Sequence, residues 1–130
     1  MIVVDASAIL EVLLITAAAP RIMARLFVTG EILCAPHLID LEVAQALRRF
    51  QLSRKLSAER SLEALEDFVA IRLTRYPHVV LLPRIWELRH NVTAYDAAYL
   101  ALAEELHAPL ITCDKALATT TGHAARVELV

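Results

Sequence analysis

Met1-Ile-Val-Val-Asp5-Ala-Ser7 and Thr93-Ala-Tyr-Asp96-Ala-Ala-Tyr99 are the two stretches that decide how this chain folds. Each places one carboxylate where an apolar element meets a turn. In the first, an unbroken aliphatic run, typical of a buried parallel strand, ends in Asp5. In the second, Asp96 occupies the first turn of an almost wholly apolar helix. Such a carboxylate costs desolvation energy unless it is hydrogen-bonded, paired or bound to a cation.

Strands and helices alternate along the rest of the chain. Strands are predicted at residues 2–4, 32–35, 79–82, 110–112 and 126–130. Helices are predicted at residues 8–14 after a Ser7 cap, 20–30, 36–52, 83–90 and 94–106, with others after Ser57 and Asp114. This alternation predicts an α/β domain with a mostly parallel sheet. Because the chain has 130 residues and no repeat or linker, we expect a single domain over residues 1–130.

The composition restricts the class of partner. The chain carries 13 Lys and Arg against 15 Asp and Glu, a formal net charge of -2. A mildly acidic protein does not bind polyanions through its overall charge, so such binding would need a local basic patch or a metal. Hydrophobic residues make up 58% of the chain, which is more than so small a domain is expected to hide alone. We therefore expect an apolar surface covered by a partner, most simply by a second copy in a homodimer.

The sequence also indicates a compartment. Cys34 and Cys113 lie in or beside predicted buried strands, as reduced thiols of cytoplasmic proteins often do. Glu11 and Arg21 interrupt the first hydrophobic segment, so no stretch reaches the roughly 18 uncharged apolar residues of a membrane span. The first residues lack the basic region of a secretion signal. We expect a cytoplasmic protein with no membrane segment.

Four carboxylates stand out by position: Asp5, Glu42, Asp96 and Asp114. Asp5 and Asp114 each follow a predicted strand, and the carboxyl ends of parallel strands border the usual ligand crevice of such a sheet. Asp96 lies at the amino end of its helix, and Glu42 flanks the apolar face of another helix. Four acids in one crevice would repel each other unless a hard divalent cation neutralised them, and Mg²⁺ or Mn²⁺ prefers such oxygen ligands.

Each acid also has a simpler interpretation. Asp5 could bond the backbone amides of the following helix, and Asp114 could be a plain helix cap. The Thr93-x-x-Asp96 pattern is also that of a capping box. Glu42 could be solvated or paired with Arg49. The joint placement of the four acids favours a shared site over these separate roles.

Four blocks of the sequence resemble the signature blocks of PIN-domain ribonucleases: Val4-Asp5-Ala-Ser7-Ala8, Ala35-Pro36-His37-Leu38-Ile39-Asp40-Leu41-Glu42-Val43, Asn91-Val-Thr93-Ala94-Tyr95-Asp96-Ala97 and Leu110-Ile-Thr112-Cys113-Asp114. They follow the family's order over nearly the whole chain, and the third block is the most specific. They are similar to those of the VapC type, toxins of bacterial and archaeal toxin–antitoxin pairs. The resemblance implies a PIN-like three-layer α/β/α domain with a central, mostly parallel sheet.

The resemblance also implies an activity and a cofactor. In such ribonucleases the positions that match Asp5, Glu42, Asp96 and Asp114 hold Mg²⁺ or Mn²⁺ and cut RNA. It therefore implies an endoribonuclease that hydrolyses phosphodiester bonds with metal assistance. We expect Asp5 and Asp96 to be primary ligands and Asp114 to complete the site. Glu42 would be a ligand or would position the attacking water.

Further residues are expected to contact the substrate. Thr112 matches a hydroxyl position that assists the acidic cluster, and Ser7 belongs to the first block. Arg49, in a basic run after Glu42, and Arg89, beside the Asp96 block, would supply phosphate contacts that acids cannot. These basic residues could instead be solvated helix ends.

The implied partners are an RNA substrate and a cognate antitoxin protein. A second hypothesis is a catalytically silent PIN-like module that binds RNA or protein, although a binder has no need of four repelling carboxylates. A metal-dependent phosphatase or DNA nuclease is a third. Only two glycines are present, so no glycine-rich phosphate loop can be built. Tyr95 and Tyr99 either stack bases or, as such an apolar helix favours, pack in the core.

Overall fold

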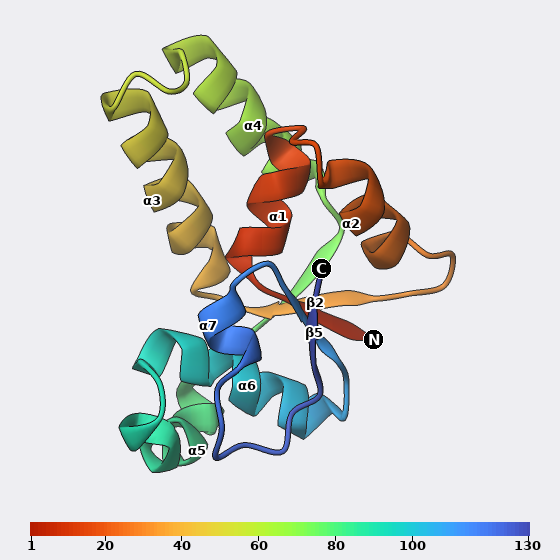
Figure 1. The fold of residues 1–130 in the computed structure, drawn as a ribbon, viewed down its shortest axis with the longest axis vertical. Coiled ribbons are helices and arrows are strands. Elements are labelled where there is room, and N and C mark those ends of the chain that lie inside the picture. The colour runs from red at the N-terminus through yellow and green to blue at the C-terminus, as the bar shows by residue number, and fades with distance from the viewer.

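Five short strands form one sheet at the centre of the molecule (Figure 1). The computed structural model describes all residues from 1 to 130. The strands are β1 (Ile2–Val4), β2 (Leu33–Pro36), β3 (Leu73–Tyr76), β4 (Leu110–Thr112) and β5 (Val127–Leu129). Their order in space is β3-β2-β1-β4-β5, and every neighbouring pair is parallel. The predicted α/β class is confirmed, and the sheet is parallel throughout.

Helices cover both faces of this sheet. They are α1 (Ala6–Leu13), α2 (Ala19–Leu26), α3 (Ile39–Leu52), α4 (Ala58–Ala70), α5 (Leu82–Glu87), α6 (Ala94–Leu106) and α7 (Lys115–Ala118), with 3₁₀ turns at Val79–Leu81 and Leu88–His90. Figure 1 shows α1 to α4 above the sheet and α5 and α6 below it, which makes three layers. None of these helices combines the length and the apolar character needed to cross a membrane.

The two stretches that decide the fold form the middle of the core. All three residues of β1 are buried, because its aliphatic side chains meet helices on both faces of the sheet. In α6 every residue from Ala97 to Ala103 is buried, as expected for a helix that is apolar all round. Its small side chains allow the helix to pack closely on β1 and β2.

The sheet reverses its direction of growth between β1 and β4. From β1 the chain adds β2 and then β3 on one side, and it returns to add β4 and β5 on the other. Val4 pairs with Ile111, and the backbone N–H of Asp5 donates to the carbonyl of Ile111 (3.2 Å). In parallel α/β sheets the crevice outside the carboxyl ends at such a switch point is the usual place for a ligand.

Polar side chains cap four of the helices, α1, α4, α6 and α7, and one of these caps differs from expectation. Ser57 caps α4 and Thr93 caps α6, as predicted. The cap of α1 is Asp5, whose carboxylate accepts from the backbone N–H of Ala8 (3.2 Å). The predicted Ser7 cap is therefore wrong, because Asp5 already has the extended backbone of a cap and Ser7 lies inside the helix.

The predicted strand at residues 79–82 is also wrong. Val79–Leu81 forms a 3₁₀ turn, and the strand is Leu73–Tyr76. It is an edge strand in which only Leu73 is buried. Such a half-exposed strand lacks the aliphatic run by which a central strand is recognised.

Candidate active site

Asp5 is the first residue after β1, and its buried carboxylate accepts three hydrogen bonds. The hydroxyl of Ser7 donates to Oδ1 (2.6 Å), and the hydroxyl of Thr112 donates to Oδ2 (2.6 Å). The third donor is the backbone N–H of Ala8, which also approaches Oδ1. Asp5 therefore holds the start of α1 and is itself held by β4.

The turn after β4 orients both hydroxyl groups. The backbone N–H of Cys113 donates to Ser7 Oγ (2.9 Å), and that of Asp114 donates to Thr112 Oγ1 (2.9 Å). Because each hydroxyl oxygen accepts from an amide, its own proton is directed to Asp5. Thr112 is fully buried, so the expected direct contact with substrate is corrected to a contact with Asp5.

Glu42 lies in the first turn of α3 and is half-buried. Its Oε2 accepts a hydrogen bond from the hydroxyl of Tyr99 on α6 (2.5 Å). No ion pair joins Glu42 to Arg49. The neighbouring acid Asp40 instead pairs with Arg75 on β3 (2.7 Å).

Asp96 and Asp114 stand at the amino ends of two helices. The backbone N–H of Asp96 donates to the hydroxyl of Thr93 (3.2 Å), as the capping pattern predicts. Asp114 caps α7 through Oδ1, which accepts from the amides of Ala116 (2.7 Å) and Leu117 (3.4 Å). Its Oδ2 makes no hydrogen bond within the protein.

These elements bring the four predicted acids to one open cavity of about 520 Å³. Asp5 comes from the end of β1, Glu42 from α3, Asp96 from α6 and Asp114 from the turn after β4. The remaining wall is formed by Ala6, Ser7, Leu10, Leu38, Leu41, Gln45, Ala46, Arg49, Tyr95 and Tyr99. None of the four acids forms an ion pair with a basic side chain. Their negative charges are therefore not neutralised by direct contact with the protein.

Burial and mutual repulsion both disfavour ionisation of these acids. Burial raises the pKa of Asp5, although its hydrogen bonds lower it in part. Burial also raises the pKa of Glu42, and the charges of Asp5 and Asp96 raise it further. The pKa of Asp96 is raised by burial and then by the charges of Asp114 and Asp5. A bound cation would remove this penalty.

The donor set fits a hard divalent cation. It consists of carboxylate oxygens alone, which Mg²⁺ and Mn²⁺ prefer over nitrogen and sulfur ligands. No three acidic, His or Cys side chains converge closely enough to hold a metal ion as they stand. Binding would therefore require at least one carboxylate to turn toward the others.

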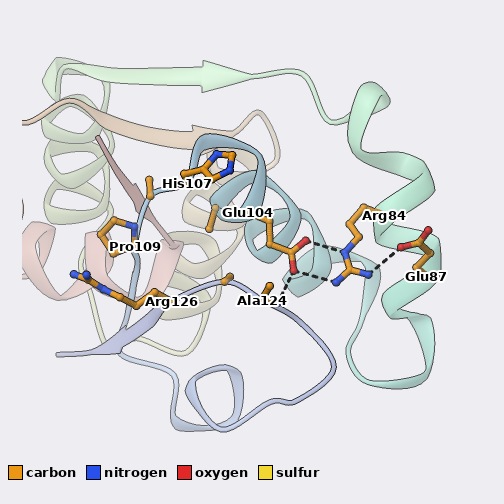
Figure 2. Close-up of a pocket in the computed structure, with 10 residues that line it drawn as sticks. Arg84, Glu87, Glu104, His107, Pro109, Ala124 and Arg126 are labelled. Atoms are coloured by element: carbon orange, nitrogen blue, oxygen red, sulfur yellow. Dashed lines mark hydrogen bonds and ion pairs between the residues drawn. The ribbon is translucent and has the colours of Figure 1, made fainter.

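A second cavity, of about 500 Å³, lies at the amino end of β4 (Figure 2). Its charged side chains already neutralise each other. Arg84 pairs with Glu104 (2.8 Å) and with Glu87 (2.9 Å), and Arg126 pairs with Glu128. This cavity lies at the opposite end of the strands from the acids, so its position and its charges both make it the weaker candidate.

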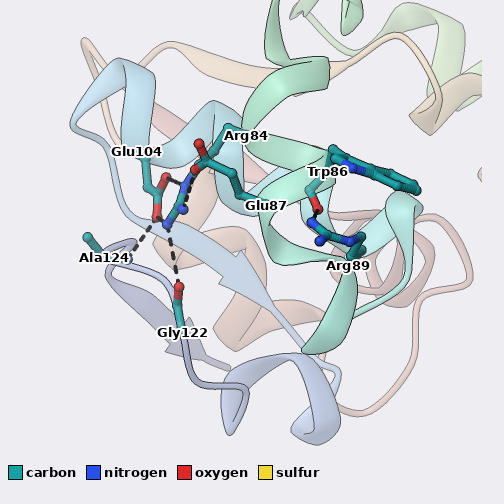
Figure 3. Close-up of polar contacts among 7 residues, drawn as sticks. All are labelled: Arg84, Trp86, Glu87, Arg89, Glu104, Gly122 and Ala124. Carbon is teal, nitrogen blue, oxygen red and sulfur yellow. Dashed lines mark hydrogen bonds and ion pairs between the residues drawn. The ribbon is translucent and has the colours of Figure 1, made fainter.

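The two arginines predicted to bind substrate lie in different places. Arg49 lines the acidic cavity, whereas Arg89 does not. Figure 3 shows Arg89 beside Trp86, where the guanidinium lies 4.9 Å from the ring centroid and donates to the backbone carbonyl of Trp86 (2.8 Å). Arg89 therefore lies outside the acidic cavity.

The two tyrosines of α6 also separate. Tyr99 is 2% exposed, as core packing predicts, but its hydroxyl reaches the cavity. Tyr95 is 66% exposed at the cavity rim, so the core interpretation is wrong for this residue. The Tyr99–Glu42 contact was not predicted; the one available signal is that Tyr99 follows Asp96 by three residues and so shares its helix face.

Comparison with known proteins identifies the family of the chain. The PIN domain family matches residues 2–122, a span that contains all four acids. The chain belongs to the PIN-domain family. Among its relatives are ribonuclease VapC9 of Mycobacterium tuberculosis, 46% identical over 92% of this chain and 91% of that protein, and ribonuclease VapC12 of the same organism, 41% identical over 100% of this chain and 99% of that protein.

A solved structure shares the PIN-domain fold. The crystal structure of VapC20 from Mycobacterium tuberculosis, described as a toxin that cleaves the sarcin-ricin loop, superimposes with a TM-score of 0.69. The match covers 95% of this chain and 97% of that chain at 16% identity, so it shows the fold alone. The expected three-layer PIN fold and the resemblance to VapC ribonucleases are both confirmed.

Proposed function

We propose that this PIN-domain protein is a Mg²⁺- or Mn²⁺-dependent endoribonuclease, the toxin of a toxin–antitoxin pair. The observation that carries the proposal is the gathering of four unpaired carboxylates in one cavity. Their elements lie far apart in the sequence, and a purely structural role gives no reason to bring their charges together. The names of its full-length VapC relatives support the same activity.

The acids would divide the work of holding the cation. Asp5 and Asp96 would be the primary ligands, with Asp114 completing the set through its free Oδ2. Glu42 would bind as a further ligand or hold the attacking water through its second oxygen. When bound, such a cation stabilises negative charge on the phosphate and lowers the pKa of water. Thr112 would act beneath the site by fixing Asp5.

Residues on the cavity wall would contact the RNA. Arg49 is exposed and lines the cavity, where its charge can attract a phosphate that the acids would repel. Tyr95 is exposed at the rim beside Asp96, and its ring can stack on an unpaired base. Ser7 lines the cavity as well, although its hydroxyl proton is committed to Asp5.

The proposed partners are a second copy of the chain and a cognate antitoxin, in the cytoplasm. Val79, Val80, Leu82 and Trp86 are all more than half exposed on one short segment before and within α5. Such a group of large apolar side chains is typical of a surface that a partner covers. Sedimentation of the purified chain at its single-chain mass of 14.4 kDa would contradict the homodimer.

The activity can be tested with matched variants. Purified antitoxin-free protein is incubated with RNA and Mg²⁺ or Mn²⁺, beside Asp5→Ala, Asp96→Asn and Asp40→Asn. Asp40 is the control because it lies on the same helix as Glu42 but pairs with Arg75 outside the cavity. We expect cutting by the parent and by Asp40→Asn, and none by the two site variants or in EDTA. Tight RNA binding without cutting would instead indicate a silent binding module.

A further inference from the structure

We propose that Tyr99 is a positioning residue that fixes Glu42 for cation binding, an inference that rests on the proposed function. The hydroxyl of Tyr99 donates to Oε2 of Glu42 across 2.5 Å. This is the only hydrogen bond that the Glu42 carboxylate makes in the structure. It joins α6 to α3, so the two helices that carry Asp96 and Glu42 meet at this contact.

Tyr99 is a rigid donor. Its ring is among the largest fully buried side chains and is part of the hydrophobic core. A tyrosine side chain has only two rotatable bonds before its hydroxyl, and tight packing of the ring fixes both. The position of the hydroxyl is therefore set by the core, not by the cavity that it borders.

Without its hydrogen bond from Tyr99, the side chain of Glu42 would be flexible. It is half-buried at the cavity and has three rotatable side-chain bonds, so the free side chain would sample many conformations. Ordering such a side chain costs conformational entropy each time a ligand binds. Tyr99 removes that cost before binding by holding Oε2, and it leaves Oε1 without a protein donor and available to a cation.

Two of the other acids are also held by hydrogen bonds from the protein. Asp5 is held by Ser7 and Thr112, and Asp114 is held through Oδ1 by the amides of α7. Tyr99 gives Glu42 the corresponding support from a third element. Removing a hydrogen bond to a metal-binding side chain changes metal affinity by about 10- to 100-fold.

A purely structural interpretation makes a different prediction. A buried tyrosine hydroxyl needs an acceptor, and Glu42 would then serve only to satisfy Tyr99. In that case loss of the hydroxyl would change stability and leave the binding of metal unaltered. Metal affinity, measured apart from activity, therefore separates the two roles.

The test compares Tyr99→Phe with Tyr76→Phe, which removes a tyrosine hydroxyl outside the cavity. The affinity of each protein for Mn²⁺ is measured from the electron paramagnetic resonance signal of free Mn²⁺. We expect Tyr99→Phe to bind Mn²⁺ about tenfold more weakly than the parent, and Tyr76→Phe to match the parent. In a Glu42→Gln background, the Tyr99→Phe change should have no further effect.

Three results would overturn the inference. The first is that Tyr99→Phe binds Mn²⁺ as tightly as the parent. The second is that Tyr99→Phe lowers Mn²⁺ affinity equally in the parent and in the Glu42→Gln background. The third is that the parent protein binds no Mn²⁺. RNA cleavage is scored separately in the same samples. A parent that binds Mn²⁺ but does not cut RNA contradicts the nuclease proposal and leaves the role of Tyr99 standing.

Discussion

Asp5 caps α1 through one carboxylate oxygen and is held by Thr112 through the other. Asp114 in the same way caps α7 and borders the cavity. The sequence presents the helix-cap role and a site role as alternatives, but each of these two caps also lines the cavity, so one role does not exclude the other. In such a cap, a backbone amide fixes one oxygen of the carboxylate. The acid is thereby held at the carboxyl ends of the strands, beside the cavity.

Thr112→Val tests the support beneath Asp5. The substitution keeps the shape of the side chain but removes a donor to Asp5 and an acceptor for the amide of Asp114. We expect RNA cleavage to fall by about 10- to 100-fold and the free energy of unfolding to fall by about 1–3 kcal/mol, because buried groups lose their partner. Thr112→Ser keeps the hydroxyl and should retain most of the RNA cleavage and most of the free energy of unfolding. Equal losses in the two variants would mean that packing, not the hydroxyl, matters.

Asp96→Asn tests the repulsion among the acids. Burial and the charges of Asp114 and Asp5 raise the pKa of Asp96 above its ordinary value of 3.8. The metal-free protein therefore loses stability as the pH rises from 3.8 through the raised pKa, and the variant avoids this loss. At pH 8 in EDTA we expect thermal melting of Asp96→Asn about 2–5 °C above the parent, with the difference vanishing near pH 3. A lower melting temperature at pH 8 would show that Asp96 chiefly stabilises the fold.

The sequence predicts that the four acids meet in one crevice, and they line one cavity, but it does not predict the residues that hydrogen-bond to them. A carboxylate after an aliphatic strand is conspicuous because it interrupts a buried pattern. The contact between Ser7 and Thr112 joins residues 105 positions apart, and that between Tyr99 and Glu42 joins residues 57 apart. Neither leaves a local pattern, since a buried tyrosine or threonine is equally at home in an ordinary core.

Elements with strong local signals were predicted more accurately than edge elements. The helix predicted at residues 94–106 has these bounds, because Thr93 caps it and an unbroken apolar run from Ala97 to Ala103 forms its middle. The sequence does not mark strand β3, because only Leu73 is buried and the next two residues, Thr74 and Arg75, are polar. The more hydrophobic Val79–Leu81 segment that follows is a turn with two exposed valines.

Glu104→Gln tests the contact that ties α5, α6 and the loop before β5 together. Glu104 accepts from Arg84 (2.8 Å) and from the backbone N–H of Ala124 (2.8 Å), as Figure 3 shows. The hydrogen bond with Arg84 lowers the pKa of Glu104 below 4.5, so its stabilisation is full above that value and is lost as the pH falls through the lowered pKa.

We expect Glu104→Gln to lower the free energy of unfolding at pH 7 by about 1 kcal/mol, a modest value because Arg84 is partly exposed. Urea unfolding at several pH values measures the effect. The parent and the variant should converge in strongly acidic solution. A loss that stays constant down to pH 3 would attribute the effect to packing instead of charge.

The order of the strands in the sheet explains how four acids that are distant in the sequence meet. Because β1 and β4 are neighbours, the residues that follow them lie side by side although about a hundred positions separate them. The helices α3 and α6 then bring Glu42 and Asp96 from opposite layers to the same crevice. Strand alternation in the sequence predicts a parallel sheet, but the order of its strands is seen only in the structure.

Asp5, Glu42, Asp96 and Asp114 are proposed to act together as one cation site. A crystal of the protein soaked in Mn²⁺ and measured by anomalous X-ray scattering at the manganese edge tests it directly. We predict an anomalous peak inside the cavity, with oxygens of at least three of the four carboxylates turned toward it. Crystals with this cavity open to solvent that show no manganese there, or show it bound only elsewhere, would contradict a shared cation site.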